Sequence, residues 1–201
     1  MIPAIVLAAG KSMRMGRPKA MLPLEGGDTF LTRIVRTFLD AEIDDVVVVV
    51  GADANVIVNA FAASGLAARF VENTEFEQGQ LSSLLVGLRV VDRPGLAATL
   101  VTLVDVPFVA PSTVRAVVDR YRRTHAPVVR PVSGARHGHP VLIDRSLFDF
   151  IRAAEPSAGA KQVVRAYASS AGDVEVEDEG AFADIDTQED YERVAPPERP
   201  R

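Results

Sequence analysis

Three predominantly apolar runs without polar alternation limit this chain to a small set of folds. They lie at residues 2–8, 46–50 and 100–104, and the second run is five valines in succession. A strand that faces water on one side alternates apolar with polar residues, whereas a continuous run indicates a strand buried on both faces. We therefore predict that these runs are central strands of a parallel sheet.

Helical periodicity fills the segments between the runs. Apolar residues recur at helical spacing over residues 28–40, 80–91 and 111–123, and Pro111 is a favourable first residue for the third helix. Strands that alternate with helices are typical of an α/β fold with right-handed crossovers. We predict a three-layer, Rossmann-like α/β architecture with a mostly parallel central sheet.

The second half of the chain is less regular. Its pattern predicts strands at residues 126–132, 139–143 and 181–187, and helices at 145–153 and 158–168.

Length and composition favour one domain. The chain has 201 residues, of which 48% are apolar, which is enough for one core. We predict a single domain over residues 1–194, with residues 1–110 and 111–194 as its two halves, and a disordered tail at 195–201. The absence of cysteine excludes disulfides, thiolate metal sites and cysteine nucleophiles.

Charge and hydropathy exclude two classes of partner. The net charge is −5, and neutralising a nucleic-acid backbone requires a basic surface. The apolar run at residues 2–8 is far shorter than a membrane span and has no basic segment before it. We expect a cytoplasmic protein that binds neither nucleic acid nor membranes.

The first apolar run leads into a loop that carries cations and glycines but no acid. The segment 7–19 contains Gly10 and Gly16, two lysines and two arginines, which favours the binding of an anion, phosphate above all. It is not a P-loop, because that motif requires glycine where Ile5 stands, and its glycine spacing does not fit a dinucleotide-binding turn. The alternative is an ordinary turn with incidental cations.

The same loop resembles a known family signature. LAAGKSMRMGRPK at residues 7–19 closely resembles that of molybdenum cofactor nucleotidyltransferases, and further resemblance follows in ENTEFEQGQLSSL, LVDVPFV, GHPVLI and DIDTQEDY. The motifs are most similar to those of the branch that transfers CMP to molybdopterin. The resemblance implies a nucleotidyltransferase fold and a cytoplasmic enzyme of molybdenum cofactor biosynthesis.

The resemblance assigns roles to residues of the first half. Arg14 and Lys19 would hold the triphosphate and offset charge as pyrophosphate leaves. The nucleotide would be bound by Leu7, Ala8, Ala9, Gly10, Lys11, Ser12, Gly79, Ser82 and Ser83, with the backbone N–H groups from Ala8 to Ser12 around its phosphates. For either serine alone, helix capping is an equally good interpretation.

Two acids are candidate ligands of Mg²⁺. Asp105 follows the third apolar run, seven residues before Ser112, too far to cap the helix that begins there. Asp186 would be the second carboxylate, and Mg²⁺ needs only one or two carboxylates besides phosphate oxygens. Asp184 admits a purely structural role. Thr187 and Asp190 have the spacing of a capping box.

His139 and Lys161 are the candidate residues for binding the acceptor substrate. The resemblance puts the sequence GHP, which includes His139, near the acceptor; a metal site made by His137, His139 and His125 is the weaker interpretation. Relatives carry Gly-Asp, one residue, then Gly-Ala-Arg where this chain has residues 156–161, so Lys161 replaces the arginine.

The function implied is Mg²⁺-dependent transfer of CMP from CTP, or GMP from GTP, to a phosphorylated acceptor, molybdopterin by the resemblance. Ala9 favours CTP, because GTP-using members carry glycine at that position. Two alternatives are another phosphorylated acceptor, such as a sugar phosphate, and a nucleotide-binding chaperone that delivers cofactor to a molybdoenzyme.

Overall fold

The computed structural model of the chain describes residues 1–10, 17–157 and 159–195. Within these residues, eight strands form one mixed sheet in the order β3, β2, β1, β4, β7, β5 and β6, with β8 paired to β5. The strands are β1 (Ala4–Ala8), β2 (Val46–Val50), β3 (Arg69–Glu72), β4 (Ala98–Leu103), β5 (Val128–Ser133), β6 (Arg136–His137), β7 (Val141–Asp144) and β8 (Asp173–Glu175).

The two halves of the sheet differ in strand direction. β3, β2, β1 and β4 run parallel to one another, so that Leu7 of β1 lies between Val49 of β2 and Leu103 of β4. β7 pairs antiparallel with both β4 and β5, and β6 is antiparallel to β5. The predicted parallel centre and α/β class are confirmed, and the sheet is mixed because its second half contains antiparallel pairs.

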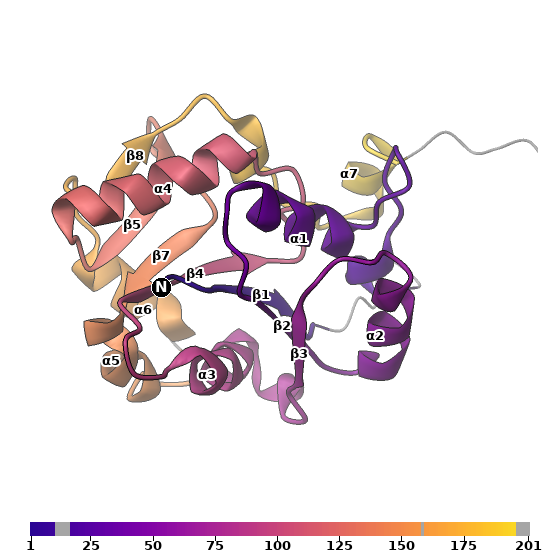
Figure 1. Ribbon diagram of the computed structural model, residues 1–201, viewed down its shortest axis with the longest axis horizontal. Coiled ribbons are helices and arrows are strands. Elements are labelled where there is room, and N and C mark those ends of the chain that lie inside the picture. The colour runs from indigo at the N-terminus through magenta and orange to yellow at the C-terminus, as the bar shows by residue number, and fades with distance from the viewer. Residues whose placement is uncertain (11–16, 158, 196–201) are drawn as a thin grey trace, which may run out of the picture.

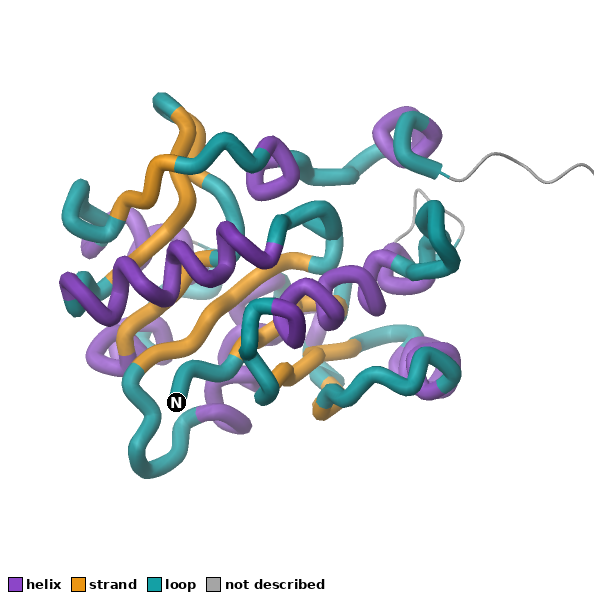
Figure 2. Tube along the Cα trace, turned by 45° about the horizontal axis from the view of Figure 1, so that its top comes forward, coloured by secondary structure: helices purple, strands orange, loops and turns teal. Residues whose placement is uncertain are grey.

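Helices cover both faces of the sheet because side chains of the central strands alternate between two cores. One core joins Ala4 and Val6 of β1 to helices α1, α2 and α4, and the other joins Ile5 of β1 to α3 and α5. Figure 1 shows α1 and α4 on one side of the sheet and α3, α5 and α6 on the other, and the strands lie between them in Figure 2. The helices are α1 (Phe30–Asp40), α2 (Ala54–Ala62), α3 (Gln80–Val91), α4 (Pro111–Thr124), α5 (Phe148–Arg152), α6 (Gly159–Tyr167) and α7 (Gln188–Glu192).

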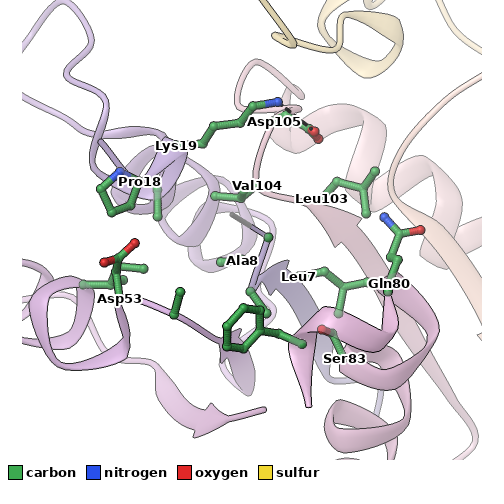
Figure 3. Close-up of a pocket in the computed structure, with 17 residues that line it drawn as sticks. Leu7, Ala8, Pro18, Lys19, Asp53, Gln80, Ser83, Leu103, Val104 and Asp105 are labelled. Atoms are coloured by element: carbon green, nitrogen blue, oxygen red, sulfur yellow. Dashed lines mark hydrogen bonds and ion pairs between the residues drawn. The ribbon is translucent and has the colours of Figure 1, made fainter. Parts of the chain in front are cut away.

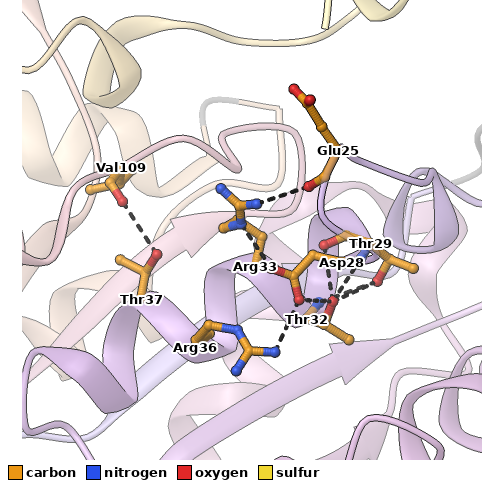
Figure 4. Close-up of polar contacts among 8 residues, drawn as sticks. All are labelled: Glu25, Asp28, Thr29, Thr32, Arg33, Arg36, Thr37 and Val109. Carbon is orange, nitrogen blue, oxygen red and sulfur yellow. Dashed lines mark hydrogen bonds and ion pairs between the residues drawn. The ribbon is translucent and has the colours of Figure 1, made fainter. Parts of the chain in front are cut away.

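Helix α1 begins at a polar cluster that fixes the chain after the first loop (Figure 4). Thr29 and Thr32 form a reciprocal capping box, and Asp28 accepts hydrogen bonds from Arg33 and Arg36 at 3.0 and 3.1 Å. Burial alone would raise the pKa of Asp28, but these arginine contacts outweigh it and the pKa is lowered.

The prediction of a strand at residues 181–187 is wrong. The segment is a 3-10 turn, Glu179–Phe182, followed by irregular chain. The backbone of this segment forms hydrogen bonds with two different loops. His139 N donates to Ala181 O at 2.8 Å, and Ile185 N donates to Asp105 O at 2.8 Å. A strand requires a regular series of hydrogen bonds with one neighbouring strand, and hydrogen bonds to two separate loops do not form such a series. The capping box at Thr187 and Asp190 is present at the start of α7.

Other sequence expectations were incomplete. The helix at residues 145–153 is divided into a 3-10 turn, Arg145–Leu147, and the short α5. The pattern did not indicate β3, α2, β6 or β8. In the described part of the chain, no helix is long and apolar enough to cross a membrane.

Candidate functional site

The parallel strands end at a common edge, and the loops that follow them enclose a cavity of about 250 Å³, here called the strand-end pocket. Open α/β sheets bind their ligands at this edge. Figure 3 shows the side chains around it, from β1, β4 and the first turn of α3. The pocket is lined by Leu7, Ala8, Ala9, Gly10, Pro18, Lys19, Ala20, Ala52, Asp53, Ile57, Phe76, Gly79, Gln80, Ser83, Leu103, Val104 and Asp105.

Among the described residues, Lys19 and two carboxylates meet at the rim of this pocket. Lys19 Nζ lies 2.8 Å from Asp186 Oδ1 and 3.3 Å from Asp105 Oδ2, and Figure 3 shows its side chain reaching toward Asp105. The hydrogen bond from Ile185 N to Asp105 O holds Asp186 at this edge. Three residues far apart in the sequence therefore form one charged cluster.

The carboxylates of this cluster suit a divalent cation. Asp105 Oδ1 is buried and has no hydrogen-bond partner among the described residues, which leaves an acceptor oxygen for a further ligand. In the described part of the chain, no group of three or more His, Cys, Asp and Glu residues is arranged to hold a metal. An ion held here would be coordinated by the two carboxylates together with water or substrate oxygens, which is the usual coordination of Mg²⁺ in proteins.

Two further titratable groups lie beside the cluster. Burial raises the pKa of Asp184, and the charge of Asp105 adds to the rise. Burial lowers the pKa of His139, although a contact between its Nδ1 and the Val101 carbonyl at 3.4 Å opposes the change. His139 is therefore neutral at pH 7 and offers hydrogen bonds rather than charge.

A tight contact closes the pocket between β1 and β2. A Cβ added at Gly51 would collide with the carbonyl oxygen of Ala9 and would lie 3.0 Å from Cγ of Phe76. Ala9 is only 3% exposed and lines the pocket. Glycine at position 51 thus allows the Phe76 ring and the end of β1 to form one wall.

The start of α3 is organised by Asn73, which the sequence pattern did not single out. Asn73 Nδ2 donates to Ser82 Oγ and Ser83 Oγ, at 2.9 Å each. The N-cap residue of α3 is Gly79, without a side-chain cap bond, so the serines do not cap this helix. Ser83 lines the strand-end pocket, whereas Ser82 lines a separate, smaller cavity of about 90 Å³.

A second, larger cavity of about 680 Å³ lies beside the strand-end pocket, and we call it the α6 cavity. Both candidate acceptor residues, His139 and Lys161, line it. Its wall is apolar where α3 and the sheet face it, and basic side chains join from β5 and α6. It is lined by Leu7, Gln80, Leu81, Leu84, Val101, Leu103, Arg130, His137, Gly138, His139, Val141, Ile143, Pro156, Ser157, Gly159, Ala160, Lys161, Val164, Arg165, Ala181, Phe182 and Asp184.

The structure brings most of the candidate residues to these two adjoining cavities. Lys11, Ser12 and Arg14 lie outside the described residues. Sequence reasoning did not identify Gln80, which lines both cavities, or Arg130. A signal for Gln80 existed, since it directly follows Gly79 at the first position of α3.

Comparison with protein families gives one extended match. The family described as "MobA-like NTP transferase domain" matches residues 4–171, which include both cavities apart from a few residues of the 181–184 segment.

Similar proteins carry several names. The purine catabolism protein PucB of Bacillus subtilis is 29% identical, with 94% of each chain covered. Nicotine blue oxidoreductase of Paenarthrobacter nicotinovorans is 30% identical, with 96% of each chain covered. A probable molybdenum cofactor guanylyltransferase of Mycobacterium avium is also 30% identical, covering 95% of this chain and 93% of that protein.

Solved structures show the same architecture. Rv0371c of Mycobacterium tuberculosis is 30% identical with a TM-score of 0.76 over 96% of each chain. Its complex with manganese gives 28% identity and a TM-score of 0.74, with coverage of 96% of this chain and 97% of that chain. A nucleotidyl transferase of Methanothermobacter thermautotrophicus is 25% identical, with a TM-score of 0.78 and coverage of 96% and 95%.

Proposed function

The chain belongs to the MobA-like NTP transferase family, and from this premise we propose that it transfers CMP from CTP to the terminal phosphate of molybdopterin, with release of pyrophosphate. An acceptor phosphate oxygen forms a bond to the α-phosphorus, and the bond from that phosphorus to the bridging oxygen of the β-phosphate breaks. The leaving pyrophosphate takes the electron pair of the broken bond. Because the acceptor phosphate is already ionised at pH 7, the reaction needs no protein nucleophile or base.

The charged cluster at the rim of the strand-end pocket is the observation that carries this proposal. Lys19 is 16% exposed and contacts Asp105 and Asp186, so its ammonium is held at the edge where a triphosphate would lie. A positioned cation stabilises the charge that develops on leaving pyrophosphate. We propose the same role for Arg14. The backbone N–H groups after β1 would bind phosphate oxygens.

The proposed cofactor is Mg²⁺, held by Asp105 and Asp186. The orphan oxygen of Asp105 and the exposed carboxylate of Asp186 supply suitable hard ligands. When bound, the ion supplies positive charge that offsets the charge of the triphosphate. The manganese complex of Rv0371c supports a divalent cation in a related protein.

We propose that residues 1–110 bind the nucleotide and residues 111–194 bind most of the acceptor. The described residues that line the strand-end pocket all belong to the first group. His139 and Lys161 would contact the acceptor in the α6 cavity. The two cavities share the side chains of Leu7, Gln80 and Leu103, so a bound acceptor would meet the nucleotide at this common wall.

The preference for CTP rests on Ala9. Ala9 lies in the pocket wall at the end of β1, and its methyl restricts the backbone there, whereas glycine would give that backbone more freedom. The relative from Mycobacterium avium carries the name of a guanylyltransferase, so GTP is the alternative substrate.

A second candidate function is supported by the relative named nicotine blue oxidoreductase, at 30% identity over almost the whole chain. A redox reaction would require a bound electron carrier, because the chain contains no cysteine. Two more candidate functions keep the nucleotide site. One is transfer to a different phosphorylated acceptor, and the other is a chaperone that binds nucleotide without turnover and delivers cofactor to a molybdoenzyme.

One assay separates these functions. The protein is incubated with CTP or GTP, Mg²⁺ or Mn²⁺, and either molybdopterin or a panel of sugar phosphates, and pyrophosphate release and product mass are measured. We expect release with CTP and molybdopterin. Release with a sugar phosphate alone would identify another acceptor, and binding without release would indicate a chaperone. Oxidation of NADH or NADPH by a nicotine-blue-type dye, with no pyrophosphate release, would favour the redox function.

A further inference from the structure

Asn73 lies at the end of β3, where the chain leaves the sheet toward α3. It is only 2% exposed, and its N–H donates to the Val50 carbonyl at 2.8 Å. A buried amide side chain is costly unless its polar atoms are paired. The partners of Asn73 therefore indicate what the residue does.

The hydrogen bonds fix the orientation of the Asn73 amide. Glu75 N donates to Asn73 Oδ1 at 3.0 Å, and a backbone N–H can only donate, so this atom must be the oxygen. The NH₂ group then faces the two serines. Its two hydrogens are used by Ser82 Oγ and Ser83 Oγ, which both accept.

The two serines differ in what remains for them to donate. Ser82 Oγ lies 3.1 Å from Glu75 O and 2.8 Å from Gly79 O, and carbonyls only accept, so its one hydrogen is used within the loop. Ser83 Oγ accepts a hydrogen bond from Asn73, and among the described residues no carbonyl or carboxylate oxygen accepts the Ser83 hydroxyl hydrogen. Its hydrogen therefore remains available, and Ser83 lines the strand-end pocket.

We propose that Asn73 is a positioning residue that holds the Ser83 hydroxyl as a hydrogen-bond donor toward the nucleotide. This inference rests on the proposed function, because it takes the strand-end pocket as the nucleotide site. Asn73 acts through Ser83 and does not touch the ligand. The nucleotide atom that faces Ser83 must accept a hydrogen bond, as O2 and N3 of cytosine do.

Asn73→Asp is the informative variant because it reverses the polarity of the network. The carboxylate still accepts from Glu75 N, but it cannot donate, so both serine hydroxyls would donate to it instead. The hydrogen of Ser83 would then point away from the pocket. Asn59→Asp, an exposed position on α2, controls for the added negative charge.

The test measures CTP binding in Mg²⁺ by titration calorimetry, with the melting temperature of each variant. We expect Asn73→Asp and Ser83→Ala each to raise Kd by about three- to tenfold, the value of one neutral hydrogen bond, and the double variant to bind no more weakly than either single one. Asn59→Asp should bind like the wild type. Unchanged Kd in Ser83→Ala, or additive losses in the double variant, would overturn the role of Asn73, and the first result stands even where Asn73→Asp does not fold. A wild type that binds neither CTP nor GTP would instead overturn the proposed function, and this inference with it.

Discussion

The two adjoining cavities are built in different ways. The strand-end pocket takes its walls from the loops after parallel strands β1, β2 and β4 and from the start of α3. The α6 cavity combines antiparallel strands β5 and β7, helix α6 and the irregular segment around Asp184. A parallel sheet brings successive loops to one edge, whereas the second cavity depends on contacts between unlike elements.

Their charges differ as well. Among the described residues, the strand-end pocket has Lys19 between two carboxylates at its rim, an arrangement suited to a triphosphate with a divalent ion. The α6 cavity carries Arg130, Lys161 and Arg165 around an apolar wall, with Asp184 near the first cluster. This contrast suggests that chemistry belongs to the pocket and acceptor recognition to the cavity, a division that single substitutions can break.

The largest effect is expected from Asp105→Asn. Loss of the carboxylate should lower kcat/KM for transfer roughly a thousandfold, equivalent to about 4 kcal/mol, because the proposed metal ligand is removed. The fold should persist, since the bond from Ile185 N uses the Asp105 backbone carbonyl. Steady-state pyrophosphate release and circular dichroism measure the two properties.

A matched control for this variant is Asp92→Asn. Asp92 pairs with Arg145 and Arg152 away from both cavities, and its loss should affect stability more than transfer. Near-normal turnover of Asp105→Asn in Mg²⁺ would remove Asp105 from the metal site.

The next effect concerns the cations of the phosphate loop. Lys19→Ala and Arg14→Ala should each cost about 2 to 4 kcal/mol of transition-state stabilisation, because each removes a charge-assisted donor that we propose binds the triphosphate. The ratio of CTP to GTP use should stay constant, since neither side chain reads the base. If kcat/KM is unchanged in both variants, the phosphate-loop interpretation fails.

The same difference between the regions explains what the sequence can predict. Runs at 2–8, 46–50 and 100–104 match β1, β2 and β4 to within two residues, because burial on both faces leaves a continuous apolar signal. β3 has two exposed ends and no such run, and β8 has three residues, so neither gave a signal.

Candidate residues follow a similar rule. Asp105 was recognisable because an acid ends an apolar run at the edge where ligands bind. Asp186 is brought close to Asp105 by one backbone hydrogen bond, from Ile185 N to Asp105 O, which joins segments far apart in the sequence. Asn73 is defined by its tertiary hydrogen bonds, which no local pattern encodes. The expected strand at 181–187 failed for the same reason, because its partners are two separate loops.

A smaller effect is expected in the α6 cavity. Lys161→Ala should weaken acceptor binding by about 1.5 to 3 kcal/mol, the value of a hydrogen bond to a charged group, which raises the KM for the acceptor by roughly ten- to hundredfold. The KM for the nucleotide should stay unchanged. Lys161→Arg, which restores the residue of the related motif, should retain most acceptor binding. A change in the nucleotide KM alone would show that the cavities do not divide the substrates at residue 110.

The last and smallest effect tests base selection at Ala9. The Ala9 side chain is buried against the core on the α3 side, and its carbonyl contacts Gly51, so the end of β1 has little freedom to move. One methyl in a binding pocket discriminates by about 1 to 3 kcal/mol, which makes a preference for CTP strong but incomplete. Ala9→Gly should narrow the ratio of CTP to GTP use by raising GTP use, because glycine frees the backbone of the wall that we propose faces the base. The assay is a competition between both nucleotides at equal concentration, and Ala4→Gly, at the start of β1, controls for the loss of a buried methyl. A wild type that prefers GTP, or an Ala9→Gly variant with an unchanged ratio, would mean that selection lies elsewhere in the pocket.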